Sequence, residues 1–237
     1  MRLRWLAPVL AAAAVLLLLL SGPTVRLGLW DFETGFRLLR WAAYLGLASI
    51  AAALAALLTR TGRRPVLLQV AALLIGAGVA YVPWHWLQLA RRVPPIHDIS
   101  TDLEHPPEFV AVLPLRAGAP NPAAYGGPEV ASAQRAGYPD LTSLVVHLAP
   151  APAFARALAS ARAMGWTLVA ADASAGRIEA TATTPWFGFK DDIVIRVAPD
   201  PAGSRVDVRS VSRVGGSDVG TNARRIRAYL ARLAAGR

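Results

Sequence analysis

Three long apolar runs in the first ninety residues constrain this chain more than any other feature of its sequence. They cover about residues 6–20, 38–58 and 66–86, and each approaches the roughly 20 residues that a helix needs to cross a bilayer. Ionisable residues are nearly absent from the runs, since Arg40 and His85 lie near the ends. Ion or proton transport requires charged groups inside the membrane, so the runs predict an anchor rather than a transporter.

The short loops beside the runs predict their orientation. Arginines precede the first run and crowd the link between the second and the third, at Arg2, Arg4, Arg60, Arg63 and Arg64. Positive residues concentrate on the cytoplasmic side of membrane proteins, so we expect these parts to lie inside. Three crossings of the inner (cytoplasmic) membrane then place everything after Leu89 outside, in the periplasm. The first run is not followed by a convincing cleavage site, and we expect it to remain as an anchor.

The net charge of +10 belongs mainly to the anchor. Residues 1–92 hold ten arginines against two acids, a charge of +8, whereas residues 93–237 hold fifteen basic residues against thirteen acids, a charge of +2. Because the positive and negative charges of residues 93–237 nearly balance, this part lacks the basic surface that nucleic-acid binding requires. We therefore expect no nucleic-acid partner. The chain has no cysteine, which excludes disulfides, thiol nucleophiles and cysteine-bound metals.

After the anchor (residues 1–92), the sequence predicts an α+β fold. Residues 93–150 are rich in proline and predict an extended segment that packs on the domain, with a short strand near 144–148. Residues 151–237 predict a compact core of one helix, four antiparallel strands and a last helix. The expected helices cover about 152–165 and 219–235, and the expected strands about 166–171, 177–184, 192–197 and 204–213. This order predicts a two-layer domain, with flanking helices on one face of the sheet and the other face partly open to water.

Several ionisable residues lie in the proline-bounded stretch Arg91–Pro107. His97, Asp98 and Asp102 are the candidate catalytic residues in this stretch, because adjacent histidine and aspartate side chains support acid–base chemistry or bind a metal. Their spacing fits no zinc signature, so we assign no metal and no cofactor. The alternative is structural: the two aspartates cap local turns.

A second set of polar residues lies on the last two strands and at the start of the last helix. Arginine side chains bind carboxylates and phosphates, and the turn Gly215–Gly220 leads into a helix N-terminus, which favours anions. The set therefore predicts a site for a small anionic ligand, or alternatively an internal network in which nearby aspartates neutralise the arginines. Trp186 belongs to an aromatic turn that either contacts an apolar ligand or the membrane interface, or closes one end of the sheet. The candidate ligand-binding residues are Arg196, Asp207, Arg209, Ser210, Ser212, Arg213, Asp218, Asn222, Arg224 and Trp186.

The soluble part also resembles a known family. The stretches that carry the resemblance are Pro95–Asp102, Trp186–Asp192, Arg196, Asp207–Gly215, Asp218, Gly220, Asn222 and Arg224. Over roughly residues 93–235 the chain resembles the domain of unknown function 1499 family of bacteria and plastids, and its anchor resembles that of a membrane-anchored bacterial branch. The family has no established reaction to carry over. The lumenal location of its plastid members implies an extracytoplasmic domain here.

Together these observations favour a membrane-anchored, extracytoplasmic binding or assembly module that is not an enzyme. The expected partners are the lipid bilayer and either an envelope protein or a small anionic ligand. The sequence contains no phosphate loop, dinucleotide motif or nucleophile elbow. Two alternatives stay open. One is a hydrolase that uses the segment with His97, Asp98 and Asp102 together with the region Arg209–Asp218, and the other is a lipid or small-ligand carrier with an apolar cavity below the last helix.

Overall fold

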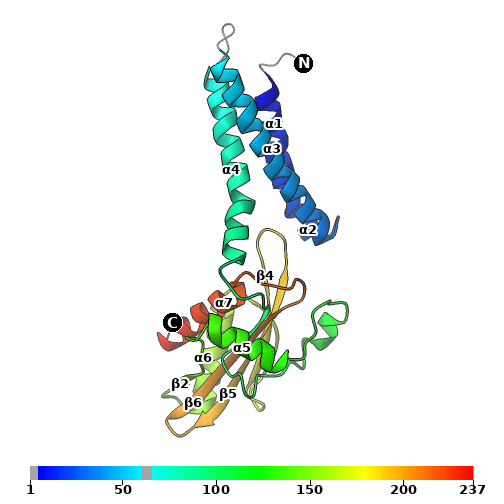
Figure 1. Ribbon diagram of the computed structural model, residues 1–237. Coiled ribbons are helices and arrows are strands. Elements are labelled where there is room, and N and C mark those ends of the chain that lie inside the picture. The colour runs from blue at the N-terminus through cyan, green and yellow to red at the C-terminus, as the bar shows by residue number, and fades with distance from the viewer. Residues whose placement is uncertain (1–4, 60–65, 237) are drawn as a thin grey trace. The chain divides into compact units, whose positions relative to one another are not determined.

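The computed structural model describes residues 5–59 and 66–236 (Figure 1), and it divides into two compact units. The helical unit contains the residues up to Leu89 together with the turn Pro185–Gly188. The sheet unit contains Ala90–Thr184 and the chain from Phe189 onward. Each unit is described by itself.

The helical unit consists of α1 (Leu6–Ser21), the short α2 (Pro23–Arg26), α3 (Phe32–Leu58) and α4 (Val66–Ala90). Within the described residues, three helices are long and apolar enough to span a membrane, which indicates membrane association. Helix α3 begins well before the predicted residue 38, because the Asp31 side chain accepts a hydrogen bond from the Thr34 N–H at 2.6 Å and caps it. The arginines that predict the orientation, Arg2, Arg4, Arg60, Arg63 and Arg64, lie outside the described residues.

Small residues let the long helices approach one another closely. Ser49 Oγ of α3 lies 3.0 Å from the carbonyl oxygen of Ala7 on α1 and 3.1 Å from that of Ala72 on α4. Gly46 of α3 and Gly76 of α4 meet backbone to backbone, since a Cβ added to Gly76 would lie 2.6 Å from the Gly46 carbonyl oxygen. Lipid tails are as apolar as leucine, so such close packing and hydrogen bonding hold membrane helices together.

The sheet unit contains six antiparallel strands among the described residues, one more than predicted, and its α+β class is as predicted. The strands are β1 (Asp98–Ser100), β2 (Leu144–Val146), β3 (Thr167–Asp172), β4 (Arg177–Thr183), β5 (Lys190–Asp200) and β6 (Gly203–Ser212). Their order is β1-β6-β5-β4-β3, and β2 pairs with the first part of β6. The helices are α5 (Gly127–Gly137), α6 (Pro150–Ala163) and α7 (Thr221–Ala234), and η2 (Leu113–Arg116) is a 3-10 turn.

One face of the sheet packs against α6 and α7. Alternate residues of the central strands, such as Ile178, Ile195 and Val208, are fully buried in this layer, as the period of two in a half-buried strand predicts. Tyr229 of α7 is also fully buried, stacks on Trp166 at 5.2 Å and donates to a backbone carbonyl oxygen of α6. Large side chains therefore fill the space between the sheet and α7.

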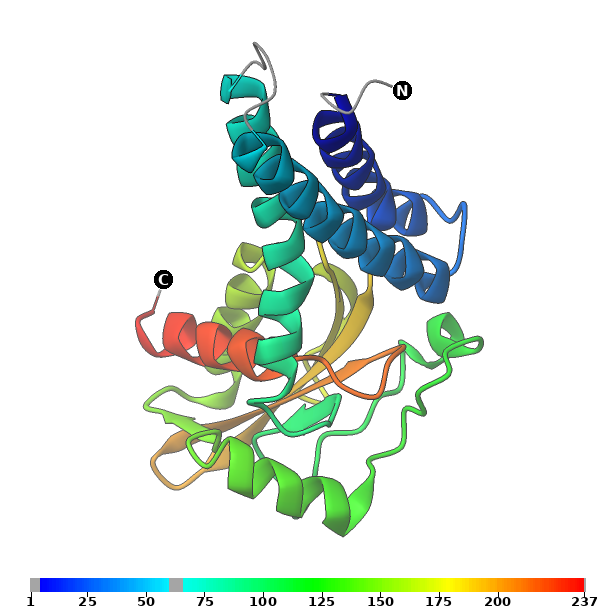
Figure 2. The ribbon, with the colours of Figure 1, turned by 45° about the horizontal axis from the view of Figure 1, so that its top comes forward.

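The opposite face of the sheet is covered by the segment between β1 and α5, residues 101–126, which we call the strap (Figure 2). Phe109 and Val112 of the strap are buried against Val194 of β5 and Val211 of β6. The strap therefore covers much of this face, and the face stays partly open, as predicted, where the side chains of Arg177, Arg196 and Arg205 are 28%, 28% and 40% exposed. Charged residues alternate with apolar ones on these strands, and an alternating pattern does not distinguish a solvated charge from one that is bonded to a covering segment.

Two elements of the proline-rich part were not predicted, namely β1 and α5. Helix α5 has Pro128 in its first turn, where proline is tolerated because no intrahelical N–H bond is lost. The side-chain amide of Gln134 on α5 bonds both the N–H and the carbonyl oxygen of Ser100, at 3.0 and 2.6 Å. These bonds satisfy the outer edge of β1, which would otherwise remain unpaired.

The close contact between α3 and α4 predicts the effect of one added methyl group. Gly76→Ala places a Cβ against the backbone of Gly46, so we expect the helical unit to lose about 1–3 kcal/mol of stability through overpacking. Gly78→Ala on the same helix is the matched control, because a Cβ there meets no atom within 4 Å. Unfolding midpoints in a denaturing detergent titration compare the two variants, and equal midpoints would contradict the close packing.

Candidate functional site

A buried ion pair joins two of the residues that the sequence singles out. Arg209 Nε and Nη2 donate to the two carboxylate oxygens of Asp98 at 2.9 and 2.7 Å. The side chains are only 2% and 6% exposed. Asp98 lies on β1 beside β6, rather than in the local turn that one alternative predicts. The structure thus brings a candidate catalytic residue and a candidate ligand residue together, but both oxygens of the carboxylate are occupied.

The same guanidinium also holds both ends of the strap. Its remaining N–H groups donate to the carbonyl oxygens of Pro107, at 3.2 Å, and Ala123, at 2.8 Å. The rings of Phe109 and Tyr125 lie over it at 5.1 and 5.3 Å, as cation–π partners. Burial, helped by the negative charge of Asp98, raises the pKa of Tyr125 to about 12. Arg209 is therefore a structural centre of the strap.

A second buried charge binds the middle of the strap. Glu179 of β4 is fully buried, and its carboxylate accepts the backbone N–H groups of Val110, Ala111 and Val112 at 2.9–3.0 Å. Arg177 Nε also donates to it, at 3.1 Å. Glu179 was not among the predicted residues, because a glutamate between Ile178 and Ala180 has the pattern of a solvated strand position.

A third buried charge binds the 3-10 turn of the strap. Asp192 of β5 accepts Nη1 of Arg116 at 2.6 Å, Nε and Nη2 of Arg213 at 2.8 Å, and Oγ1 of Thr181 at 2.6 Å. Burial opposes the ionisation of Asp192, but hydrogen bonds from Arg213, Thr181 and Arg116 outweigh it and hold its pKa below the ordinary value. Arg116 was not among the predicted residues, since a lone arginine in a proline-rich segment carries no pattern.

On the helix face, the remaining polar candidates hold β6, α7 and the start of β1 together. Ser210 Oγ donates to Asn222 Oδ1 at 2.7 Å, and Asn222 Nδ2 donates to the backbone carbonyl oxygen of His97 at 3.0 Å and lies 3.1 Å from Ser212 Oγ. His97 therefore contributes its backbone, not its imidazole, to this network. Burial raises the pKa of the Asp218 carboxyl, which accepts two backbone N–H groups in the first turn of α7.

Two predicted ligand residues lie apart from these buried groups. Arg224 folds back onto its own helix and donates to Val219 O and Thr221 Oγ1 at 3.1 and 3.0 Å. Trp186 belongs to the helical unit, where its indole N–H donates to Ser21 Oγ at 3.4 Å. These contacts are structural, and neither residue shares a side-chain hydrogen bond with Arg209 among the described contacts.

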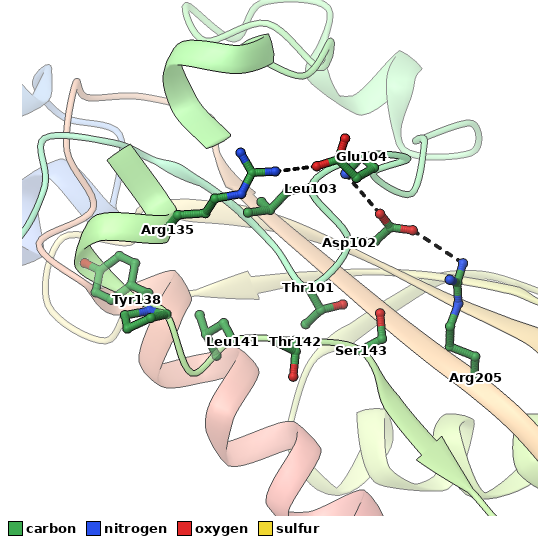
Figure 3. A pocket seen from close by; sticks show the side chains of 11 residues that line it. Thr101, Asp102, Leu103, Glu104, Arg135, Tyr138, Leu141, Thr142, Ser143 and Arg205 are labelled. Atoms are coloured by element: carbon green, nitrogen blue, oxygen red, sulfur yellow. Dashed lines mark hydrogen bonds and ion pairs between the residues drawn. The ribbon is translucent and has the colours of Figure 1, made fainter. Parts of the chain in front are cut away.

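The surface of the sheet unit is hollowed beside Asp102 (Figure 3). The hollow has a volume of about 420 Å³ and lies between the start of the strap, the end of α5, the loop that follows α5, and β6. Its charged walls are Asp102, Glu104, Arg135 and Arg205, and hydroxyl groups come from Thr101, Thr142 and Ser143. The size is within the range of small-ligand sites.

The charged groups of this hollow remain available, unlike the buried ones. The side chains of Arg135 and Glu104 pair with each other but are 57% and 72% exposed. An exposed pair of this kind contributes about 1 kcal/mol or less, so it exchanges partners at low cost. Arg205 is 40% exposed and lies 3.4 Å from Asp102 and 3.2 Å from the buried Asp207. The hollow thus offers both signs of charge to a polar partner.

Asp102 is held by several hydrogen bonds. Its carboxylate accepts the N–H groups of Glu104 and His105 at 3.1 and 2.9 Å, and it pairs with Arg196 at 2.8 Å. Burial raises its pKa, but these hydrogen bonds outweigh burial, so the pKa lies below the ordinary value and the group stays ionised at neutral pH. Among the described residues, no group of three or more histidine and acidic side chains is arranged to hold a metal ion.

A second hollow, of about 520 Å³, lies on the other side of Glu104 and His105. Arg177 and Arg196 face it from directly opposite positions on β4 and β5. Their charges are already matched, because Glu179 binds Arg177 and Asp207 binds Arg196 at 2.8 Å. With Glu104 and Glu108 also on its walls, this hollow lacks the excess positive charge that a small anionic ligand requires.

Comparison with known proteins identifies one family. Residues 98–233, more than half of the chain, match the family model described as "Protein of unknown function (DUF1499)". No curated protein matches the chain.

The buried ion pair predicts a large and specific loss of stability. Arg209→Lys keeps the positive charge but removes the planar donors that bind Asp98, Pro107 and Ala123. We expect the sheet unit to lose about 3–5 kcal/mol of unfolding free energy, and backbone amides of the strap to exchange faster in hydrogen–deuterium exchange.

The matched control for this prediction is Arg227→Lys. Arg227 also binds an aspartate through two nitrogens, at 2.5 and 2.7 Å, but that pair is exposed. We expect this variant to lose less than about 1 kcal/mol. Equal losses in the two variants would show that Arg209 does not hold the strap.

Proposed function

We propose that this chain, which belongs to the DUF1499 family of proteins of unknown function, is a membrane-anchored binding or assembly module and not an enzyme. In this proposal the helices α1, α3 and α4 hold the sheet unit at the membrane. The sheet unit then recognises a polar segment of an envelope protein in the hollow beside Asp102.

One observation carries this proposal: the charged residues of the sheet unit fall into two groups. The buried ones, such as Asp98, Arg209 and Asp192, bind one another or the strap through well-formed hydrogen bonds. Among the described residues of the hollow, Arg135 is 57% exposed and retains donors that a partner can take at low cost, and Arg205 is 40% exposed although it pairs with Asp102 and Asp207. General acid–base catalysis requires a group that can reach the substrate, whereas the carboxylates of Asp98 and Asp192 are occupied by arginine donors.

The chemistry of the hollow also indicates what it binds. Arg205 and Arg135 favour carboxylates, whereas Glu104 and Asp102 favour ammonium and guanidinium groups. Because both signs are present, the fitting partner carries both as well. A peptide segment with acidic and basic side chains has this property, whereas a purely anionic ligand does not.

The proposed location is the periplasmic side of the inner membrane. It rests on the arginines of the sequence before α1 and between α3 and α4, which favour the cytoplasm. The sheet unit follows α4 after three crossings and is therefore expected on the opposite side.

A change at the rim of the hollow tests the binding role. We expect Arg205→Ala in the full chain to lower the affinity for a partner that co-purifies in mild detergent by about tenfold or more. The reason is that a hydrogen bond to a charged group is lost. Arg162→Ala is the control, since this residue is also exposed but lies on α6, away from the hollow.

Co-purifying proteins that are identical for wild type, Arg205→Ala and Arg162→Ala would count against the hollow as the binding site. Arg209 is unsuitable for this test, because its removal unfolds the strap and would abolish binding indirectly.

A C-terminal reporter tests the location separately. Alkaline phosphatase fused to the C-terminus is expected to be active, since it folds only outside the cytoplasm, and green fluorescent protein at the same place is expected to be dark. The opposite result would place the sheet unit in the cytoplasm and overturn the periplasmic part of the proposal.

A further inference from the structure

The outer side of the strap carries a concentration of exposed aliphatic side chains. Val110, Leu113 and Leu115 are 50%, 44% and 56% exposed. Among the described residues of the sheet unit, Val145 at 41% is the other large hydrophobic side chain exposed to a similar degree. Exposed apolar side chains are normal when scattered, but their concentration in one short segment indicates an interaction surface.

The stretch that carries them, residues 110–124, presents no charged side chain outward, whereas the exposed Glu104 and Glu108 lie in the earlier part of the strap. Between Val110 and Ala124 the sequence contains one ionisable residue, Arg116. Its side chain is buried and bonded to Asp192 below the strap. The residues that face outward around the turn are therefore leucine, valine, proline, alanine and glycine.

The strap cannot hide these side chains by rotating. Its backbone N–H groups at 110–112 are bonded to Glu179, and the carbonyl oxygen of Leu115 accepts Arg213 Nη1 at 2.8 Å. Farther on, Asn121 Nδ2 lies 3.0 and 2.9 Å from backbone carbonyl oxygens of the Ser212–Gly215 region. These groups bond the sheet, and other backbone N–H groups, such as those of Leu113 and Leu115, bond carbonyl oxygens within the strap itself. The aliphatic groups are therefore held outward.

We propose that the outer side of the strap docks on the surface of the lipid bilayer, with the side chains of Val110, Leu113 and Leu115 at the boundary between headgroups and acyl chains. This proposal does not depend on the binding role of the hollow. It also does not depend on the side of the membrane on which the sheet unit lies.

The composition of the surface favours lipid over a protein partner. The energetic centres of protein interfaces are enriched in tryptophan, tyrosine and arginine, with hydrogen-bonding groups around them. The outer side of the strap presents none of these side chains, and its backbone donors at 110–112 are already bonded. Acyl chains require no hydrogen-bond partners, so a purely aliphatic surface suits them.

The short linker after α4 keeps the start of the strap close to the bilayer. Seven residues separate the end of α4 at Ala90 from the start of β1 at Asp98, and they span at most about 25 Å. The strap begins directly after β1. Tethering raises the effective concentration of the bilayer at the strap. A small binding free energy from each aliphatic side chain that enters the lipid is therefore sufficient for docking.

Site-specific fluorescence in the full chain tests this proposal. The chain has no cysteine, so Leu113→Cys, Leu115→Cys and the control Val145→Cys each take a single nitrobenzoxadiazole label. All three positions are exposed, and labelling them leaves the core intact. The variants are reconstituted into nanodiscs of phosphatidylcholine and phosphatidylglycerol.

We expect the emission of labels at 113 and 115 to shift to the blue on transfer from detergent to nanodiscs, with strong quenching by a shallow nitroxide lipid and weak quenching by iodide. The label at 145 is expected to show no blue shift, weak quenching by the nitroxide lipid and strong quenching by iodide. Labels at 113 and 115 that iodide quenches as strongly as the label at 145 would overturn the proposal. Protection from both quenchers would also overturn it, since a protein partner or a second copy would then cover the strap.

Discussion

The fold of the sheet unit depends on the buried pair between Arg209 and Asp98. This pair joins β6 to β1, and its guanidinium also binds two carbonyl oxygens and two aromatic rings of the strap. Burial of a charge is costly unless the group is paired and fully hydrogen-bonded. The strap must therefore lie where it does for the arginine to be satisfied, and the arginine must be present for the strap to stay.

The same principle extends across that face of the sheet. Glu179 and Asp192 are buried because the strap supplies backbone N–H groups to one and Arg116 to the other. The sheet thus has an apolar face toward α6 and α7 and a charged face toward the strap, and the strap covers much of the charged face. The groups that stay exposed lie on the outer surface: the hollow beside Asp102, with the pair Arg135–Glu104, and the outward side chains of residues 110–124.

This arrangement explains why the sequence does not separate the buried charges from the exposed ones. Arginine, serine and aspartate residues on β5 and β6 have the composition of an anion site, yet most of them bond one another. The groups that remain available, such as Arg135 and Arg205, come from α5 and from the solvent side of β6, and no motif marks them. Helix α5 was itself missed, because Pro128 in its first turn and the surrounding prolines resemble a loop.

The sequence by itself determined the apolar helices, the α+β class and the alternation of the central strands, because these depend on local periodicity and length. It also contained the residues of the family resemblance, and the family model matches over residues 98–233. Only the tertiary structure decided which charges are buried, since Arg209 meets Asp98 across more than a hundred residues of chain. A single sequence specifies the side chains but not their distant partners, and at these positions the distant partner decides whether a charge holds the fold together or remains free to bind.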